Sequence, residues 1–427
     1  MIDLKRLRQD PEGSRASLLR RGDPSLGPLL DALLELDRQR RDLLVRVEGL
    51  KSERNAASEE VARRKRAGEP ADELMARLKA SGDEVKDLDA RLRDIDAALD
   101  ARALVLPNFP LAEVPDGDAS RNRVVRTWGE RPSFAFEPRP HWELGAALGI
   151  LDLPAGAKLT GSGFPVFRGM GARLVRALSN FMLDLHTTEH GYVEIAPPAL
   201  VNRSSLTGTG QLPKFEEDLY ALAADDLFLI PTAEVPVTNL HRGEILEAAD
   251  LPRGYTAFTP CFRREAGAHG KDTRGLIRVH QFDKVELVRL SRPEDSPAEH
   301  ELLTGHAEAV LQRLEIPYRV VELAAGDTGF ASARTYDLEV WAAGVGTWLE
   351  ASSSSTFTDF QARRAGIRYR PAPRAKPEFV HTLNASGVAF PRTIVALLEN
   401  NQDADGSVRV PNALVPYLGT ERLTPRA

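Results

Sequence analysis

The chain has 427 residues, of which 42% are hydrophobic and 28% charged, and its formal net charge is −6. This composition is typical of a folded protein, and the length favours one large domain with a smaller companion. The acidic balance argues against a surface that binds nucleic acid everywhere, so such contacts would need local clusters of Arg and Lys. Cys261 is the single cysteine, which excludes an internal disulfide and a multi-cysteine zinc site.

The sequence carries no sign of secretion or of membrane insertion. The start, from Met1 to Arg6, lacks the apolar core of a signal peptide. No later stretch approaches the roughly 18 apolar residues of a membrane span. We therefore expect a cytoplasmic protein with no membrane partner.

The N-terminal quarter predicts an antiparallel helical hairpin. Apolar residues recur at steps of three and four from Leu29 to Val61 and again from Leu74 to Leu99, the pattern of a coiled coil. Gly68 permits a chain reversal between the two runs, since glycine readily ends a helix. The hairpin should span about residues 28–104, and limbs of over thirty residues would be roughly 45 to 55 Å long.

A basic cluster lies at the predicted tip of this hairpin. Its members are Arg63, Arg64, Lys65 and Arg66. A charge run is often only a solvated helix face. Its place at the end of a long lever favours contact with the phosphates of a nucleic acid.

The chain changes character after the hairpin. Pro107, Pro110 and Pro115 end the helical pattern, and a polar stretch follows. We expect an N-terminal domain over residues 1–110, a linker over 111–135 and a second domain over 136–427. In the second domain short β-rich runs alternate with amphipathic helices without regular βαβ spacing. This predicts an α+β fold with a mainly antiparallel sheet flanked by helices.

The segment over residues 261–286, CFRREAGAHGKDTRGLIRVHQFDKVE, holds the densest set of chemical groups. It predicts two strands joined by a charged loop, and strand alternation would place Arg263 and Glu265 on one face of the first strand. The residues expected to share one face of the second strand are Arg278, His280, Phe282, Lys284 and Glu286. A guanidinium, an aromatic ring and carboxylates suit a nucleotide and a small zwitterion. An exposed hairpin with surface ion pairs is the alternative.

This segment resembles motif 2 of the class II aminoacyl-tRNA synthetases, in the form found in the bacterial seryl-tRNA synthetase family. Residues 191–198 and the amphipathic helix before them resemble motif 1, whose helix and strand form the dimer interface of that family. Residues 384–400 resemble motif 3, which places Arg392 in the first turn of a helix. The likeness spans nearly the whole chain and also includes residues 207–214, 231–234, 335–341 and 359–364.

The resemblance implies a site for ATP. Arg263 would engage the α-phosphate and the carboxylate of serine, and Arg392 would hold the γ-phosphate. Phe282 would stack on adenine, and Glu265 would accept a hydrogen bond from its amino group. Other expected ATP contacts are Arg264, Val279, Glu350, Ala351, Ser352 and Ser353. Of these, Glu350 and Ser353 are the implied Mg²⁺ ligands, and the expected catalytic residues are Arg263, Glu265 and Arg392.

The resemblance also implies a serine pocket. The expected contacts are Thr232, Ala233, Glu234, Arg263, Glu286 and Ser386. Carboxylates would satisfy the ammonium group, and a carboxylate with a hydroxyl partner can bind the side-chain hydroxyl. A site built around that hydroxyl would reject alanine by ~10⁴-fold, because its buried polar groups would lose their partner. Threonine must be excluded by shape.

The implied function is a serine–tRNA ligase that requires ATP and Mg²⁺ and no zinc. Serine would attack the α-phosphorus, and the seryl adenylate would then acylate tRNA(Ser). The family usually serves selenocysteine tRNA as well, so tRNA(Sec) is a further expected partner, and a homodimer is the expected assembly. The N-terminal hairpin lies where that family carries its tRNA-binding arm.

Two positions depart from the family pattern. Pro391 stands where we expect glycine before the motif 3 arginine. Proline is tolerated at a first helical position, so the helix should begin there, although proline has no backbone N–H to offer to ATP. Residues 356–358 read Thr-Phe-Thr, where the family more often has Asn and Cys.

Two other functions remain open from the sequence alone. A synthetase-like paralogue would activate an amino acid and transfer it to a carrier protein, although it would have no use for a basic-tipped helical lever. A catalytically dead nucleic-acid-binding coiled-coil protein would not need Arg263, Glu265, Glu286 and Arg392. Amino-acid-dependent pyrophosphate exchange, followed by charging of bulk tRNA, separates the three functions.

Overall fold

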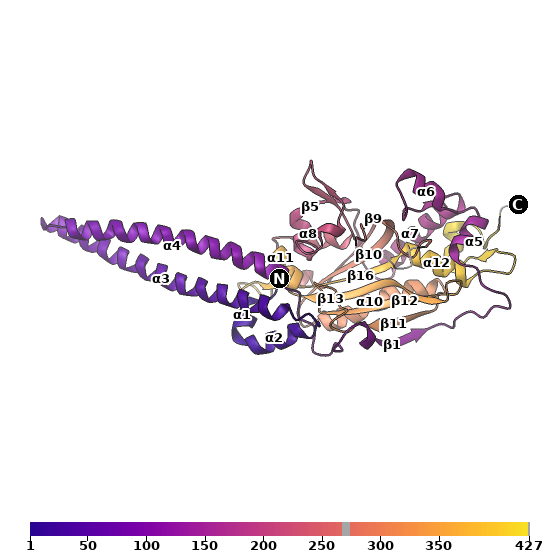
Figure 1. The fold of residues 1–427 in the computed structure, drawn as a ribbon, viewed down its shortest axis with the longest axis horizontal. Coiled ribbons are helices and arrows are strands. Elements are labelled where there is room, and N and C mark those ends of the chain that lie inside the picture. The colour runs from indigo at the N-terminus through magenta and orange to yellow at the C-terminus, as the bar shows by residue number, and fades with distance from the viewer. Residues whose placement is uncertain (267–273, 426–427) are drawn as a thin grey trace. The chain divides into compact units, whose positions relative to one another are not determined.

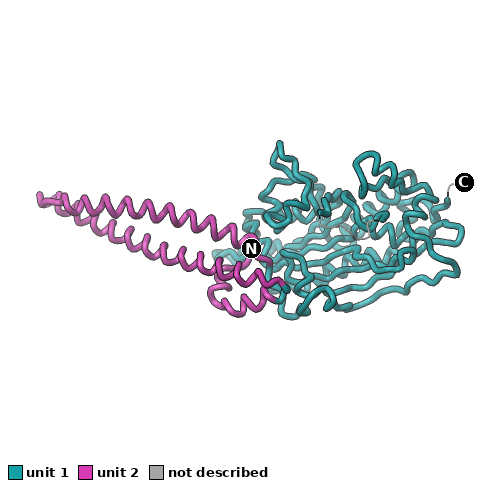
Figure 2. The backbone as a smooth tube through the Cα atoms, in the orientation of Figure 1, with its two compact units in different colours: residues 1, 20–22, 108–427 teal, residues 2–19, 23–107 magenta. Residues whose placement is uncertain are grey.

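The computed structural model describes residues 1–266 and 274–425. The chain divides into two compact units, shown in Figure 2. One comprises residues 2–19 and 23–107, and the other comprises residues 1, 20–22 and 108 onward.

The N-terminal unit is entirely helical. Its helices are α1 (Leu4–Gln9), α2 (Pro11–Leu19), α3 (Leu26–Ala67) and α4 (Asp72–Val105). The long helices α3 and α4 pack side by side, as Figure 1 shows, which confirms the predicted hairpin. Gly68 ends α3 in the left-handed conformation, at φ 73°, where a glycine has no steric penalty. With 42 residues, α3 is roughly 63 Å long and exceeds the predicted limb, whereas α4 is roughly 51 Å long.

Apolar contacts and ion pairs together hold α3 against α4. Val47 of α3 and Val85 of α4 are buried between the helices. Arg40 interrupts the apolar pattern of α3, and its Nε lies 2.5 Å from a carboxylate oxygen of Asp96 on α4. A cation at this position therefore faces an anion on the opposite helix, which helps to fix how the two helices are aligned.

The larger unit is built on an eight-stranded sheet. Its order is β1, β11, β12, β13, β16, β10, β9, β4, and every neighbouring pair is antiparallel except β4 with β9. These strands are β1 (Arg123–Trp128), β4 (Val193–Glu194), β9 (Arg253–Phe262), β10 (Gln281–Ser291), β11 (Tyr318–Glu322), β12 (Arg334–Ala342), β13 (Thr347–Thr358) and β16 (His381–Ala389). The predicted α+β fold with a mainly antiparallel sheet is confirmed.

Helices pack on the long strands of this sheet. In particular, α10 contacts β13 and β16, α12 contacts β12 and β10, and α7 contacts β9 and β10. The helices of this unit are α5 (His141–Ala147), α6 (Leu153–Leu159), α7 (Met170–Thr188), α8 (Arg203–Thr209), α9 (Glu234–Thr238), α10 (Ser296–Arg313), α11 (Phe360–Ala365), α12 (Phe390–Asn400) and α13 (Val415–Leu418). The largest core cluster draws residues from α5, α7, α10, α12 and the central strands.

The described residues also form four smaller sheets. Their strands are β2 (Leu151–Asp152), β3 (Val166–Phe167), β5 (Leu200–Asn202), β6 (Ala221–Leu222), β7 (Leu227–Leu229), β8 (Ile245–Glu247), β14 (Arg368–Arg370), β15 (Glu378–Phe379), β17 (Val408–Arg409) and β18 (Arg422–Leu423). Pro391 lies in the first turn of α12, so the helix begins there as the sequence predicts.

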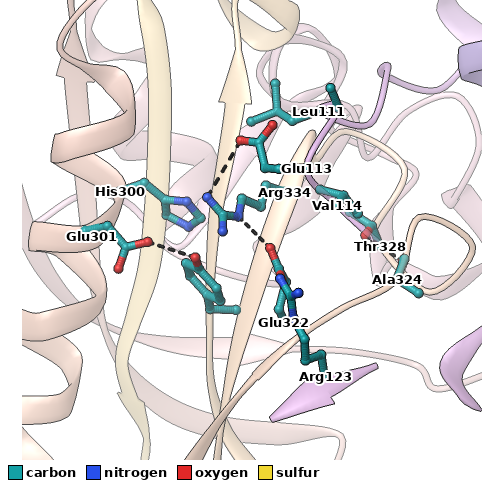
Figure 3. A network of polar contacts seen from close by, with 12 residues as sticks. Leu111, Glu113, Val114, Arg123, His300, Glu301, Glu322, Ala324, Thr328 and Arg334 are labelled. Carbon is teal, nitrogen blue, oxygen red and sulfur yellow. Dashed lines mark hydrogen bonds and ion pairs between the residues drawn. The ribbon is translucent and has the colours of Figure 1, made fainter. Parts of the chain in front are cut away.

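The edge strand β1 forms within the stretch that the sequence indicates as a linker. A network of polar contacts joins it to its neighbours (Figure 3). The buried carboxylate of Glu322 on β11 pairs with Arg123 of β1 and, at 2.8 Å, with Arg334 of β12. The Arg334 guanidinium lies 4.7 Å from the ring centre of Tyr336, whose hydroxyl donates a 2.8 Å hydrogen bond to Glu301 of α10. A buried carboxylate is costly unless it is paired, and here two guanidinium groups stabilise it.

Candidate active site

Two adjoining cavities lie over the central strands of the large sheet. Their volumes are about 660 Å³ and about 220 Å³. Six residues line both cavities and so form a common wall: Arg263, Glu265, Arg278, Lys284, Glu350 and Ser386. They come from the segment after β9, from β10 and the segment before it, and from β13 and β16. A ligand in one cavity would therefore lie beside a ligand in the other.

The larger cavity has a floor of interlinked polar side chains. Lys284 on β10 is buried, and its ammonium group pairs with Glu286 and donates a 2.9 Å hydrogen bond to the hydroxyl of Thr232. The Thr232 hydroxyl in turn donates to Glu286 over 3.2 Å, and Asn384 on β16 donates to the other Glu286 oxygen over 2.8 Å. Both Glu286 oxygens therefore have partners, and these partners, Lys284, Thr232 and Asn384, line the cavity.

Glu234 begins α9 and lies in the wall of the same cavity. Burial, reinforced by the nearby Glu286 carboxylate, raises the pKa of Glu234 to about 7. The side-chain amide of Gln361 on α11 donates a 2.6 Å hydrogen bond to Glu234, and Thr382 holds that amide from its other end over 2.7 Å. A carboxyl group that titrates near neutral pH thus lies where a ligand can reach it.

The smaller cavity combines an aromatic face with a guanidinium. The Arg263 guanidinium lies 5.2 Å from the centre of the Phe282 ring. Val279 and Ala351 also line this cavity, with Pro391 at the start of α12. A flat aromatic heterocycle could lie against Phe282 while a phosphate group meets Arg263.

Arg263 and Glu265 lie beyond the end of β9, so the prediction that they share a face of the first strand is wrong. The β9–β10 ladder ends at the pair Phe262 and Gln281, and Glu265 adopts a left-handed backbone at φ 51°. One further backbone hydrogen bond follows this pair, from the Arg263 N–H to the carbonyl of His280 over 2.9 Å. The side chains of Arg263 and Glu265 nevertheless line the two cavities, and Glu265 forms an ion pair with Arg278.

Two of the residues expected on the second strand precede it. Arg278 and His280 lie before β10, which begins at Gln281. Arg278 lines both cavities. The ring of His280 lies 5.3 Å from the ring of Phe164, outside the residues that line either cavity.

Arg392 reaches the smaller cavity from the first turn of α12. Its guanidinium donates hydrogen bonds to the carbonyl oxygens of Glu350, over 2.6 Å, and of Ile277, over 3.2 Å. A carboxylate oxygen of Glu350 lies 3.4 Å from the same guanidinium. These partners hold Arg392 at the cavity, where an incoming phosphate could replace the carboxylate.

Oxygen atoms gather on β13 near the common wall. The Ser353 hydroxyl donates a 2.6 Å hydrogen bond to Asp337 on β12. Burial, together with the Glu350 carboxylate, raises the pKa of Asp337 well above its usual range. The Glu350 carboxylate can attract a cation, although in the described part of the chain no three His, Cys, Asp or Glu side chains form a metal-binding group. Glu350 and Ser353 therefore fit Mg²⁺ only with further oxygen ligands, such as those of phosphates.

The structure brings most of the predicted site residues together. The predicted residues that line one or both cavities are Thr232, Glu234, Arg263, Glu265, Val279, Phe282, Glu350, Ala351, Ser353, Ser386 and Arg392. The predicted residues that line neither are Ala233, Arg264, Glu286 and Ser352. Ala233 belongs to a core cluster, and the Ser352 hydroxyl donates to the carbonyl of Ser386 over 2.5 Å.

Three polar residues of the site were not among the predicted contacts. Lys284 was expected on the same strand face as Phe282 and Glu286, but the sequence did not assign it a role. Asn384 and Gln361 gave no such signal, because their hydrogen bonds to Glu286 and Glu234 span 98 and 127 residues of sequence.

The basic cluster lies at the end of α3, as predicted. Glu60 pairs with Arg63, over 2.6 Å, and with Arg64, over 2.9 Å. These hydrogen bonds lower the pKa of Glu60 to about 2. Lys65 and Arg66 complete the cluster in the last turn of the helix. Two of the four positive charges are thus partly balanced by a neighbouring carboxylate.

Two family models match the chain. Residues 1–110 match the seryl-tRNA synthetase N-terminal domain. Residues 215–401 match the tRNA synthetase class II core domain (G, H, P, S and T). The serine–tRNA ligase of Gemmatimonas aurantiaca is 58% identical over 420 residues, covering 98% of this chain and 99% of that protein.

The chain belongs to the serine–tRNA ligase family. Another member, from Citrifermentans bemidjiense, is 55% identical and covers 99% of this chain and all of that protein. Among solved structures, the seryl-tRNA synthetase of Pyrococcus horikoshii, complexed with ATP, has a TM-score of 0.96 at 38% identity and covers both chains fully. The cytoplasmic serine–tRNA ligase of Naegleria fowleri, in complex with AMP, has a TM-score of 0.88 at 28% identity, covering 98% of this chain and 97% of that one.

In the described ranges, no helix combines the length and the apolar character that crossing a membrane requires.

Proposed function

We propose that this chain activates L-serine with ATP and transfers it to tRNA(Ser). In the first step a serine carboxylate oxygen attacks the α-phosphorus, the bond from that phosphorus to the bridging oxygen breaks, and pyrophosphate leaves. In the second step a hydroxyl of the terminal tRNA ribose attacks the seryl carbonyl, and AMP leaves. Neither step needs a protein nucleophile, so positioning and charge stabilisation supply most of the rate.

The common wall of the two cavities carries this proposal. Serine must lie in one cavity and the nucleotide in the other, with the serine carboxylate and the α-phosphorus in contact between them. Arg263 lines both cavities. Its guanidinium can hold the carboxylate and the α-phosphate together, and its charge can balance the negative charge that develops at phosphorus.

The smaller cavity has the features of an ATP site. Phe282 offers its ring to adenine, and Glu265 offers a carboxylate to the adenine amino group. Arg392 would exchange its contact with the Glu350 carboxylate for the γ-phosphate, helped by the positive end of α12. Mg²⁺ bound with ATP, held by Glu350 and Ser353 and by phosphate oxygens, would supply charge neutralisation.

The larger cavity has the features of a serine site. The ionised Glu234 carboxylate can accept a hydrogen bond from the serine ammonium group. Ser386 and Thr232 offer hydroxyl groups, and Glu286 sets the orientation of Thr232 from behind the cavity. Alanine would leave these buried polar groups without a partner, whereas threonine must be excluded by the shape of the wall.

The helical hairpin is the proposed tRNA contact. Its tip presents Arg63, Arg64, Lys65 and Arg66 to solvent, and clustered cations bind phosphates with a strong salt dependence. Both tRNA(Ser) and tRNA(Sec) are proposed substrates, and the proposed location is the cytoplasm.

A homodimer is the proposed assembly. The motif 1 strand β4 lies at one end of the large sheet, and its residue Val193 is 56% exposed. An exposed apolar side chain on an edge strand is what a second copy could cover.

Amino-acid-dependent pyrophosphate exchange tests the proposal. Labelled pyrophosphate should enter ATP with L-serine and not with the other standard amino acids, and the same protein should then charge bulk tRNA with serine. Exchange without charging would favour a ligase that serves a carrier protein. Failure of every amino acid to stimulate exchange would contradict catalysis altogether.

A further inference from the structure

A buried histidine links the motif 3 helix to the end of the motif 2 loop. His141 begins α5, and none of its side chain is exposed. Its Nδ1 lies 2.7 Å from Oε1 of Glu399 in the last turn of α12. Its Nε2 accepts a 2.9 Å hydrogen bond from the backbone N–H of Leu276. The imidazole thus lies between the two segments.

These contacts determine the tautomer of His141. A backbone N–H can only donate, so Nε2 must present a lone pair to Leu276. The ring proton is then on Nδ1 and is donated to Glu399. The carboxylate therefore fixes which nitrogen is the acceptor.

Glu399 is itself held by backbone donors. Oε1 also accepts from the backbone N–H of His141 over 2.8 Å. Oε2 accepts from the backbone N–H groups of Gly344, over 2.8 Å, and Val345, over 3.0 Å. Four donors thus converge on one fully buried carboxylate, and such a network rigidifies the side chain it surrounds.

The residue before Leu276 has no room for a side chain. Gly275 has φ 70°, and a Cβ built on it would lie 2.1 Å from Nε2 of His141. The residue after Leu276 is held by the other end of α12, since Arg392 donates to the carbonyl of Ile277 over 3.2 Å. The C-terminal end of α12 therefore acts on Gly275 and Leu276 through His141, and its N-terminal end acts on Ile277 through Arg392.

We propose that His141 is a positioning residue for the nucleotide cavity. It fixes the backbone at Leu276, and the chain from there carries Arg278 and Val279 into the cavity wall. Glu399 orients the imidazole, so the last turn of α12 helps to place motif 2 while its first turn presents Arg392. The expected effect on KM for ATP rests on the proposed function. The hydrogen bond from Leu276 to His141 can be measured without any activity.

A matched pair of variants separates the acceptor from the donor. In His141→Asn the amide nitrogen occupies the place of Nδ1, so the bond to Glu399 survives and the acceptor for Leu276 is lost. In His141→Gln the longer side chain can offer its amide oxygen to Leu276. We expect His141→Asn to raise KM for ATP about tenfold in serine-dependent exchange and to leave KM for serine within about twofold. His141→Gln should recover most of the affinity for ATP.

Amide hydrogen exchange of the full-length protein is the second readout. The Leu276 amide should be protected in the wild type and in His141→Gln, and unprotected in His141→Asn, while amides of β9 and β10 stay protected in all three. Gly275→Ala should also remove the protection of the Leu276 amide, because the added methyl group would displace the His141 ring. These amide-protection results do not depend on whether serine supports exchange of pyrophosphate. Failure of the His141 proposal can therefore be distinguished from failure of the proposed function.

Three outcomes would overturn the proposal. One is an unchanged KM for ATP in His141→Asn, and another is Leu276 protection that survives this substitution. The third is equal damage in His141→Asn and His141→Gln, with protection lost throughout the sheet, which would show that His141 only supports the fold.

Discussion

Gln361 donates a 2.6 Å hydrogen bond to Glu234, across 127 residues of sequence, inside the larger cavity. An amide nitrogen can only donate, so it fixes Oε1 of Glu234 as an acceptor and leaves Oε2 as the oxygen that can take a proton. The pKa of this carboxyl is raised to about 7 by burial and by Glu286. The charge of the proposed ammonium site therefore changes near neutral pH.

The first prediction concerns the pH dependence of serine use. Below about pH 7 Glu234 is neutral, and above it the carboxylate can bind the serine ammonium group. We therefore expect kcat/KM for serine, measured by pyrophosphate exchange, to fall as pH decreases through about 7. Glu234→Gln keeps the side-chain size and should abolish this inflection while lowering kcat/KM at pH 8. A variant with an unaltered inflection would assign the titration to another group.

The raised pKa of Glu234 also affects the stability of the fold. The folded pKa of Glu234 lies above the ordinary value of 4.5, so its contribution to stability is fully present below that value and is lost as pH rises through about 7. The free energy of unfolding of Glu234→Gln should therefore exceed that of the wild type at pH 8 by more than at pH 5. Denaturant titrations at both pH values measure this difference.

A second prediction concerns the selection of serine over alanine. Glu286→Ala removes the acceptor that orients Thr232 and leaves the buried Lys284 ammonium without its carboxylate. We expect the ratio of kcat/KM for serine to that for alanine to fall by at least tenfold, and the protein to lose about 3–5 kcal/mol of stability. Glu286→Gln, which retains an acceptor for Thr232, should lose less selectivity. An unchanged ratio in both variants would mean that the serine hydroxyl is read elsewhere.

A third prediction concerns the nucleotide. Arg392→Ala removes a guanidinium from the smaller cavity, and we expect a loss of about 10²–10³ in the rate of serine-dependent exchange at fixed ATP. Arg409→Ala is the matched control, because Arg409 pairs with Glu315 over 3.0 Å and lines neither cavity. Equal rates for the two variants would remove Arg392 from the account.

A fourth prediction separates the hairpin from the catalytic unit. Replacing the four basic residues at the tip with Ala should weaken tRNA binding and reduce the slope of log affinity against log salt by up to about 3. Because Glu60 already balances part of the charge on Arg63 and Arg64, we expect Lys65 and Arg66 to contribute more. Exchange of pyrophosphate should not change, and its loss would refute this separation of roles. Arg38→Ala, which breaks a pair with Glu35 lower on α3, is the control.

Local patterns were enough to predict the hairpin and the class of the sheet. The turn at Gly68 and the apolar steps along α3 and α4 depend on neighbours in sequence, which periodicity reports directly. The edge strand β1 could not be predicted this way, because its pairing with β11 and the ion pair of Arg123 with Glu322 join segments 199 residues apart.

The site was predictable in its residue types and not in its local geometry. Arg263 and Glu265 line the cavities although neither belongs to a strand, since alternation along a sequence cannot show where pairing with the next strand ends. Glu286 illustrates a further limit: its place in the sequence does not show that Lys284 and Asn384, which line the larger cavity, pair with it.

A crystal structure of the protein with a non-hydrolysable seryl-adenylate analogue would show whether one ligand spans both cavities beside Arg263. We expect adenine against Phe282, the group that replaces the α-phosphate within hydrogen-bond distance of Arg263, and the serine ammonium group beside Glu234. An analogue bound outside the two cavities, or bound across them with Arg263 and Glu234 both turned away from it, would contradict the proposed function.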